Sequence, residues 1–390
     1  MDIAEFQQTL ATAKFTPIED LENRPVFILG PDSYHAAERK HFLNRNLHNI
    51  VAYIDDFRQG EDDSGVPYWS FDRLSREISG YMKSNPVALD FSSKPQTSKI
   101  FREKCEAIHL PCFDFTVAQL QFNNTYAVYE TAQDYRQKTL DNLDRFMAFM
   151  GRLDDDLSKK TLFNNLMFRL TGERKFVHQA YTDFLQEYFS VPSSENLTFA
   201  VGTKEHLVDC GAYHGTVIDK LLNLTGNQYQ SITAFEPDPD NFRVISEKHG
   251  KRQRTRILNQ ATGKEKGQIL FLRTGTMGSR IVPQGTPGAS PVDIVRLDDC
   301  VDKCTFLKMD IEGAEPYTLT GGGGVIARER PRMAICTYHY AMDFLEAFSI
   351  IDEICPGYHF RVRQHCPSYY YDLVLYASPL PGNQPLAHCA

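Results

Sequence analysis

Short apolar runs alternate with helix-length segments over the first third of the chain. The runs at 25–30, 50–56 and 86–91 predict buried strands, each bounded by residues that favour turns. Ser70 precedes one of the intervening segments and is a suitable N-cap for a helix. Because strands that alternate with helices are typical of a parallel sheet, we predict a small Rossmann-like α/β domain over residues 1–124.

Between residues 125 and 195 the apolar positions recur with helical spacing instead. Leu140, Leu143 and Phe146 follow this period, and a second helical pattern stops at Thr171-Gly172. These patterns predict a helical connector that continues to Tyr188-Phe189. A connector in this place could also serve as a lid over the domain that follows.

Residues 196–390 contain the remaining strands, which are again separated by helix-length segments. Five apolar runs and a closing hairpin predict a doubly wound α/β domain. The predicted strands are 206–208, 231–235, 255–258, 306–309 and 332–336, and the hairpin strands are 358–362 and 371–376. Ligands bind at the carboxyl edge of such sheets, so the residues that end these strands are candidate site residues.

Composition narrows the class of protein. The chain has 390 residues and is 42% hydrophobic, and its formal net charge of -8 weighs against a nucleic-acid partner, which would favour a basic face. Nine cysteines without a CxxC pair suggest free thiols in a reducing compartment. We expect no signal peptide, because Met1-Asp2-Ile3-Ala4-Glu5 lacks a basic region and an apolar core, and we find no apolar run long enough to span a membrane. We expect a cytoplasmic protein with a small-molecule or saccharide substrate, with a homo-oligomer possible.

The first domain resembles a dinucleotide-binding unit only in part. Gly30 ends one predicted strand and the acids at 55 and 56 end the next, but Asp32-Ser33-Tyr34 replaces the glycines that would approach a pyrophosphate. Asp32 also places a negative charge where a phosphate would bind. We therefore expect a structural or partner-binding domain, loosely similar to the N-terminal domains of bacterial sugar-modifying enzymes.

The most informative motif in the second domain is a glycine turn between two acidic strand ends. Asp209 ends the first strand before Gly211 and Gly215, and Glu236 ends the second. A carboxylate beside a helix N-terminus would repel a pyrophosphate but suits a cationic cofactor such as S-adenosyl-L-methionine. Glu236 is then placed to accept hydrogen bonds from ribose hydroxyls.

Several residues around these strand ends are candidates for cofactor binding. Asn259 and Ala261 follow the third strand, where they could meet the adenine edge, whereas we expect Asp238 and Asn241 to cap the next helix. The predicted cofactor-binding residues are Asp209, Gly211, Ala212, Tyr213, His214, Gly215, Glu236, Pro237, Asn259, Ala261 and Asp310.

The fourth and fifth strand ends carry the candidate catalytic residues. Asp310 and Glu312 follow the fourth strand, and His339 follows the fifth. We expect Asp310 to face the methyl-transfer centre, and a neutral His339 imidazole to be a second candidate base. Glu315 begins a helix, where its charge would favour the helix dipole. A metal held by Asp310 and Glu312 is a weaker alternative because no third ligand is identifiable, so no metal is predicted.

These motifs together resemble the FkbM family of S-adenosylmethionine-dependent methyltransferases over about residues 155–377. The ordered set comprises the 209–215 turn, 235–237, Gly278-Ser279-Arg280, 295–299, 308–315, Tyr338-His339 and 373–377. The resemblance implies a class I methyltransferase fold, which is a seven-stranded doubly wound sheet with an antiparallel strand near its end. The N-terminal domain lies outside it.

The resemblance implies an O-methyltransferase (EC 2.1.1.-) that acts on a hydroxyl of a sugar, a polysaccharide precursor or a natural product. Two alternatives remain open: an NAD-dependent sugar-modifying enzyme that works through the N-terminal domain, and a non-catalytic protein that retains a cofactor fold. Methylation of an amino group in nucleic acid is disfavoured, because the chain has no Asn-Pro-Pro-Tyr or Asp-Pro-Pro-Tyr motif.

Overall fold

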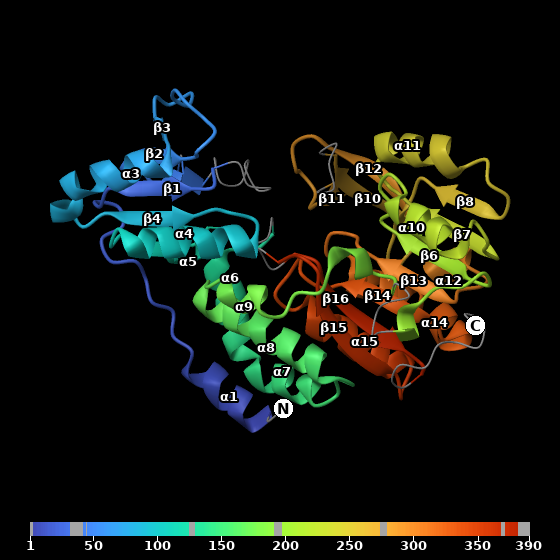
Figure 1. Ribbon diagram of the computed structural model, residues 1–390. Coiled ribbons are helices and arrows are strands. Elements are labelled where there is room, and N and C mark those ends of the chain that lie inside the picture. The colour runs from blue at the N-terminus through green and yellow to red at the C-terminus, as the bar shows by residue number, and fades with distance from the viewer. Residues whose placement is uncertain are drawn as a thin grey trace.

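The computed structural model describes residues 3–31, 42–43, 45–124, 129–190, 197–273, 279–367 and 371–380. Two α/β domains are joined by a group of helices (Figure 1). Positions 32–34 and Gly278, which the sequence analysis used, lie outside the described residues. None of the described helices is both long enough and apolar enough to cross a membrane.

The N-terminal domain is a parallel five-stranded sheet with strand order β3-β2-β1-β4-β5. The predicted strands and the Ser70 cap are confirmed, since the Ser70 hydroxyl accepts from the Arg73 N–H. Its strands are β1 (Val26–Leu29), β2 (Ile50–Ile54), β3 (Tyr68–Trp69), β4 (Val87–Asp90) and β5 (Cys112–Asp114). Its helices are α3 (Phe71–Glu77), α4 (Pro95–Ala107) and α5 (Phe115–Gln121), with short 3-10 turns at Ile78–Gly80 and Met82–Ser84.

The carboxyl edge of this sheet is filled by an arginine from the connector. Arg174 is fully buried, and its guanidinium pairs with Asp90 at 2.8 Å and Asp114 at 2.9 Å. It also donates to the backbone carbonyls of Asp90 and Ser92. Burial alone would raise the pKa of Asp114, but Arg174 and Arg102 outweigh burial and lower it. The two acidic strand ends are therefore neutralised by the chain itself.

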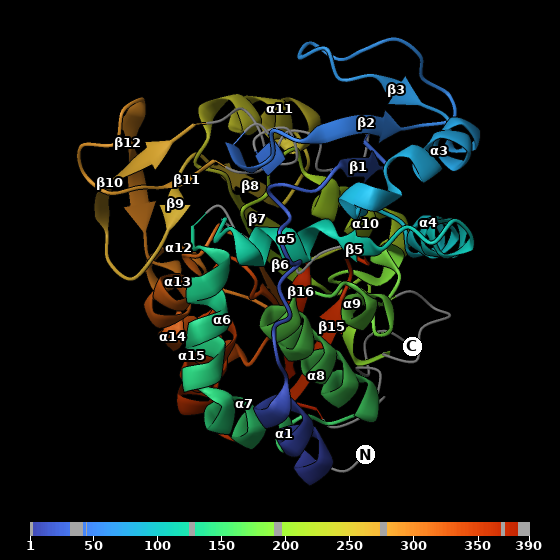
Figure 2. The ribbon, with the colours of Figure 1, turned by 90° about the vertical axis from the view of Figure 1, so that its left-hand side faces the viewer.

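The predicted helical connector is confirmed, and it packs against both domains. Its helices are α6 (Ala132–Asp141), α7 (Leu143–Met150), α8 (Asp156–Thr171) and α9 (Lys175–His178), followed by 3-10 turns at Phe184–Gln186 and Leu197–Phe199. Figure 2 shows α8 in front of β15 and β16 of the second domain. Gly172, at φ +74°, ends α8 as predicted. The N-terminal helix α1 (Ile3–Thr12) packs on α7 and α8, away from the 1–124 domain to which the sequence assigned it.

The C-terminal domain has the predicted seven-stranded sheet, in the order β15-β16-β14-β13-β6-β7-β8. Only β16 runs antiparallel to its neighbours β14 and β15. The strands are β6 (His206–Cys210), β7 (Ser231–Phe235), β8 (Thr255–Leu258), β13 (Phe306–Met309), β14 (Arg332–Cys336), β15 (His359–Gln364) and β16 (Leu373–Ser378). The helices are α10 (Thr216–Thr225), α11 (Pro239–His249), α12 (Leu297–Cys300), α13 (Glu315–Gly321), α14 (Gly323–Glu329) and α15 (Asp343–Ile354).

A second, four-stranded sheet that the sequence analysis did not predict lies between β8 and α12 in the chain. Its strands are β9 (Ala261–Thr262), β10 (Gly267–Leu272), β11 (Arg280–Ile281) and β12 (Ala289–Val295), in the order β11-β10-β12-β9. It has a small apolar core of its own around Phe271 and Val292. This sheet stands beside α13 and so borders the carboxyl edge of the large sheet (Figure 2).

Candidate active site

The glycine turn after β6 brings the first and fourth strand ends into contact. Gly211 has φ +78°, and a Cβ built on it would lie 1.9 Å from the backbone oxygen of Asp310. Gly215 has φ +79° and precedes α10, where a Cβ would strike His249. Both positions therefore require glycine, and Gly211 is needed for the approach of Asp310 as well as for the turn.

Glu236 ties the glycine turn to the end of β7. Its Oε2 accepts from the Tyr213 N–H at 2.7 Å, and its Oε1 accepts from the Asp238 N–H at 2.9 Å. Burial raises the pKa of Glu236 to about 7, although these two N–H donors oppose the shift. Each carboxylate oxygen keeps a second lone pair, so the group can still accept from a ligand. Its position fits the predicted ribose-binding role.

Asn259 supports the turn that follows Glu236. Its side-chain amide donates to the carbonyls of Glu236 at 2.9 Å and Pro237 at 3.1 Å. Asp238 caps α11 as predicted, by accepting from the Asp240 N–H. The Asn259 amide thus shapes the turn, and its predicted contact with the adenine stays a prediction.

Of the other predicted cofactor residues, Ala212, Tyr213 and His214 belong to the glycine turn, whereas Ala261 lies in the four-stranded sheet. His214 stacks on Tyr213 with ring centroids 3.8 Å apart and lies 3.1 Å from Asn241, so these residues line the glycine turn. Asn241, expected only to cap α11, instead holds the His214 ring. Ala212 is buried beneath the turn. Ala261 packs in the core of the four-stranded sheet, away from the turn.

Asp209 does not face a ligand, which corrects the prediction that it meets the cofactor cation. Its carboxylate is fully buried and lies 3.2 Å from the ammonium of Lys308 on the neighbouring strand. The Lys308 ammonium also donates to the carbonyl of Gly211 at 2.7 Å. Asp209 and Lys308 therefore form an internal ion pair that supports the glycine turn from below.

Asp310 is the exposed acid of this edge and is held by two tyrosines. The hydroxyl of Tyr188 is 3.2 Å from Oδ2, and that of Tyr338 is 3.3 Å from Oδ1. The Asp310 side chain keeps 27% of its surface exposed, whereas both tyrosines are largely enclosed. Tyr188 ends the connector, so the segment interpreted from sequence as a lid does contact the candidate catalytic acid.

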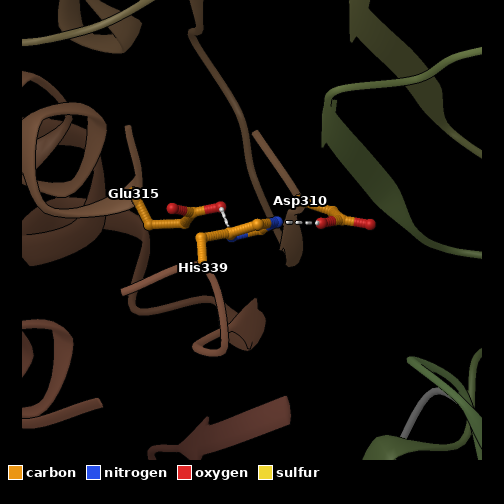
Figure 3. A group of neighbouring side chains, drawn as sticks. All are labelled: Asp310, Glu315 and His339. Atoms are coloured by element: carbon orange, nitrogen blue, oxygen red, sulfur yellow. Dashed lines mark ion pairs between the residues drawn. The ribbon is translucent and has the colours of Figure 1, made fainter. Parts of the chain in front are cut away.

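His339 is surrounded by carboxylates, which corrects the expectation of a neutral imidazole. Its Nδ1 is 3.4 Å from Glu315, and its Nε2 is 3.5 Å from Asp310 (Figure 3). Glu312 is a third carboxylate, 3.6 Å from Nε2. Burial alone would lower the pKa of His339, but these carboxylates raise it to about 10. A protonated imidazole cannot act as a base near neutral pH.

Glu315 is a buried residue that holds the loop after β13, and not a surface acid at a helix N-terminus. It is fully buried, and its Oε1 accepts from the Ile311 N–H at 2.8 Å, which fixes the loop after β13. Glu312 has φ +60° in this loop and accepts from the hydroxyl of Tyr129. The position of Tyr129 in the connector gave no signal in the sequence.

A cavity of about 490 Å³ opens beside these acids, between α13 and the four-stranded sheet. Its walls include Glu312, Gly313, Tyr317, Tyr340 and the segment 262–269. Tyr317 is 61% exposed and Tyr340 is 36% exposed. The sequence analysis missed this cavity because half of its wall comes from the unpredicted sheet.

Comparisons with known proteins agree with this geometry. Residues 209–365 match the Methyltransferase FkbM domain. The crystal structure of Methyltransferase FkbM from Methylobacillus flagellatus KT is 25% identical, with a TM-score of 0.76 over 96% of this chain and 98% of that chain. That similarity includes the N-terminal domain, which the sequence analysis had left outside the resemblance.

More distant similarities cover less than half of the chain. Aeropyrum pernix fibrillarin, solved with natively bound S-adenosyl-L-methionine, is 11% identical over 47% of this chain and 70% of that chain, with a TM-score of 0.31. Precorrin-6y C5,15-methyltransferase from Geobacter metallireducens GS-15 is 13% identical over 46% and 82%, with a TM-score of 0.28. No curated protein matches this chain.

The seven-stranded sheet, its antiparallel β16 and the acidic carboxyl edge are those expected from the resemblance. Methyltransferases of this kind take S-adenosyl-L-methionine, in agreement with the cofactor predicted from the sequence. Residues 209–365 therefore match the FkbM methyltransferase domain, and the chain along 96% of its length is similar in structure to an FkbM methyltransferase.

Proposed function

We propose that this protein is an S-adenosylmethionine-dependent O-methyltransferase that acts on a hydroxyl of a sugar, a polysaccharide precursor or a natural product. The observation that carries the proposal is the close packing of Gly211 on the backbone of Asp310. Because of this contact, the acid at the end of β13 lies directly beside the cofactor turn. A reacting carboxylate and a cofactor site therefore share one edge of the sheet.

Residues of the turn fit the non-reacting end of the cofactor. Glu236 would accept hydrogen bonds from the ribose hydroxyls, since its backbone donors leave lone pairs free. Tyr213 and His214 form a stacked surface next to it. Bound S-adenosylmethionine supplies an electrophilic methyl group on a sulfonium, which passes to the attacking oxygen as the carbon–sulfur bond breaks.

Asp310 is the residue that would take the proton of the acceptor hydroxyl. Its two oxygens are oriented by Tyr188 and Tyr338, and part of its surface is open. His339, held protonated by its carboxylate neighbours, positions Asp310 and does not remove the proton itself. Alignment of oxygen, methyl and sulfur would provide most of the acceleration, with the base adding to it.

The cavity beside Glu312 supports an acceptor that carries hydroxyl groups. The rings of Tyr317 and Tyr340 offer flat apolar surfaces, and Glu312 offers an acceptor for hydroxyl hydrogens. Glu312 also lies 3.6 Å from His339, so an acceptor bound there would reach the Asp310 edge. A sugar ring combines an apolar face with several hydroxyls and suits such a wall.

Calorimetry with S-adenosylmethionine tests the proposal, and NADH titration tests the alternative. We expect one molecule of S-adenosylmethionine bound per chain and no NADH binding, because Arg174 fills the carboxyl edge of the N-terminal sheet. A protein that is folded by circular dichroism but does not bind S-adenosylmethionine would contradict the proposal. The acceptor class can be found by screening nucleotide-sugars and polysaccharide fragments for release of S-adenosylhomocysteine.

A further inference from the structure

Three buried or half-buried side chains with metal-ligating atoms meet where β13 and β14 end. Figure 3 shows Glu315, His339 and Asp310 in a row, with the imidazole between the two carboxylates. One ligand atom from each residue lies within 4.8 Å of the other two. These residues come from a strand end, a helix start and the loop after the next strand, so the fold of the domain fixes their approach.

The polar atoms of this cluster are poorly satisfied by the protein. Among the described residues, Oε2 of Glu315 has no hydrogen-bond partner, and the two nitrogens of His339 form ion pairs with carboxylates at 3.4–3.6 Å without a hydrogen bond of acceptable geometry. His339 is only 3% exposed and Glu315 is fully buried, so bulk water cannot satisfy these atoms. Leaving buried polar atoms without a partner costs about 1–3 kcal/mol each. A ligand bound at this place would satisfy these atoms.

The local charge indicates that this group is a cation. His339 faces Glu315, Asp310 and Glu312, and the nearby Lys308 is already paired with Asp209. One imidazolium cannot balance this number of carboxylates.

We propose that Asp310, Glu315 and His339 bind a divalent cation of the Mg²⁺ or Mn²⁺ class. Carboxylate oxygens favour these hard ions, and an imidazole nitrogen is a common additional ligand for Mn²⁺. The sequence offered only Asp310 and Glu312 for such a site, and the fold supplies His339 and Glu315. Glu312 remains close enough, 3.6 Å from Nε2, to orient a water on the ion.

The role of the ion rests on the proposed function, although the site itself does not. A divalent cation next to Asp310 would lower the pKa of an acceptor hydroxyl, so that the oxygen attacks the methyl group as a partly formed alkoxide. The proton leaves to Asp310 or to water.

Titration of the full-length, EDTA-treated protein with MnCl₂ tests the site. We expect the electron paramagnetic resonance signal of free Mn²⁺ to fall with a stoichiometry of one ion per chain. His339→Asn and Asp310→Asn should each weaken binding about tenfold or more, as expected when a contact near the metal is lost. His48→Asn, which changes an exposed histidine of the first domain, should bind Mn²⁺ like the wild type.

Three results would overturn the site: no Mn²⁺ binding at millimolar concentration, a stoichiometry other than one, or binding that His339→Asn leaves unchanged. If the variants do not fold, broadening of the wild-type His339 ring resonances by substoichiometric Mn²⁺ gives the same answer. Binding of S-adenosylmethionine is measured on the same wild-type sample. Loss of Mn²⁺ binding alone overturns only the site, whereas absence of S-adenosylmethionine binding overturns the proposed function.

Discussion

The chain contains two doubly wound sheets, and acids end strands at the carboxyl edge of both. In the N-terminal sheet Asp90 and Asp114 are neutralised by Arg174, which is fully buried between them. In the C-terminal sheet Asp310 keeps part of its surface open and is contacted by the hydroxyls of Tyr188 and Tyr338 and by His339. The first edge is closed by the chain's own cation, and the second still has room for a ligand.

An acidic strand end therefore does not by itself mark a site. Within the C-terminal sheet the same contrast recurs, since Lys308 neutralises Asp209 while Asp310, two strand positions beyond Lys308, has no lysine or arginine partner in the described part of the chain. What distinguishes Asp310 is its partly exposed side chain, which lies beside His339 but has no ion pair with a lysine or arginine among the described residues. This difference is open to measurement, because removal of the cation from a buried ion pair leaves an uncompensated buried charge, whereas a partly exposed acid is solvated by water.

The largest expected effect comes from removing the cation of the closed edge. Arg174→Met keeps an unbranched side chain, although a shorter one, and removes the cation that pairs with the buried Asp90 and Asp114. Breaking one side of a buried ion pair destabilises proteins by about 3–5 kcal/mol. We expect a loss of that size in the free energy of unfolding, measured by urea denaturation.

Two further variants complete this comparison. Lys175→Met removes a neighbouring cation that is 58% exposed, and should change stability by less than about 0.5 kcal/mol. Asp310→Asn, at the open edge, should cost less than about 1 kcal/mol. If Asp310→Asn destabilises the protein as much as Arg174→Met, the distinction between the two edges is wrong.

The second expected effect concerns cofactor affinity. Glu236→Ala removes the predicted acceptor of the ribose hydroxyls, and hydrogen bonds to charged groups contribute about 1.5–3 kcal/mol. We expect the dissociation constant of S-adenosylmethionine to rise about 10- to 100-fold in calorimetry. Glu247→Ala is a matched control, because this glutamate lies on the adjacent helix α11 and its side chain is 69% exposed. Equal affinities in the two variants would remove Glu236 from the site.

The acids at the carboxyl edge of the C-terminal sheet could be predicted from the sequence, whereas the ion pairs inside the two sheets could not. Asp310 and Glu236 could be found because each directly follows a strong apolar run, and parallel strands bring their carboxyl ends together. The pairing of Asp209 with Lys308 could not be found, because it depends on the register of β6 against β13. Arg174 likewise follows a helix end and gives no signal of its distant partners.

The missed sheet has a similar physical reason. Two of its strands, β9 and β11, have only two residues each, too few to produce an alternating pattern. The pairing of β11 with β10, and of β9 with β12, is set by contacts that form only in the folded domain. The cavity wall, and with it the side of the site that would face the acceptor, was therefore hidden from the sequence.

The smallest expected effect is a pH dependence of cofactor binding that follows Glu236. Burial raises the pKa of this carboxyl group to about 7, so about one-tenth of it is ionised at pH 6 and about nine-tenths at pH 8. The ionised form accepts hydrogen bonds from both ribose hydroxyls, whereas the protonated form has lost part of that capacity. Affinity for S-adenosylmethionine should therefore increase, by up to about tenfold, as the pH rises from 6 to 8. Glu236→Gln, which cannot ionise, separates this effect from titration of the cofactor's own amino group. A wild-type profile that parallels that of Glu236→Gln would show that the Glu236 carboxylate does not contact the ribose.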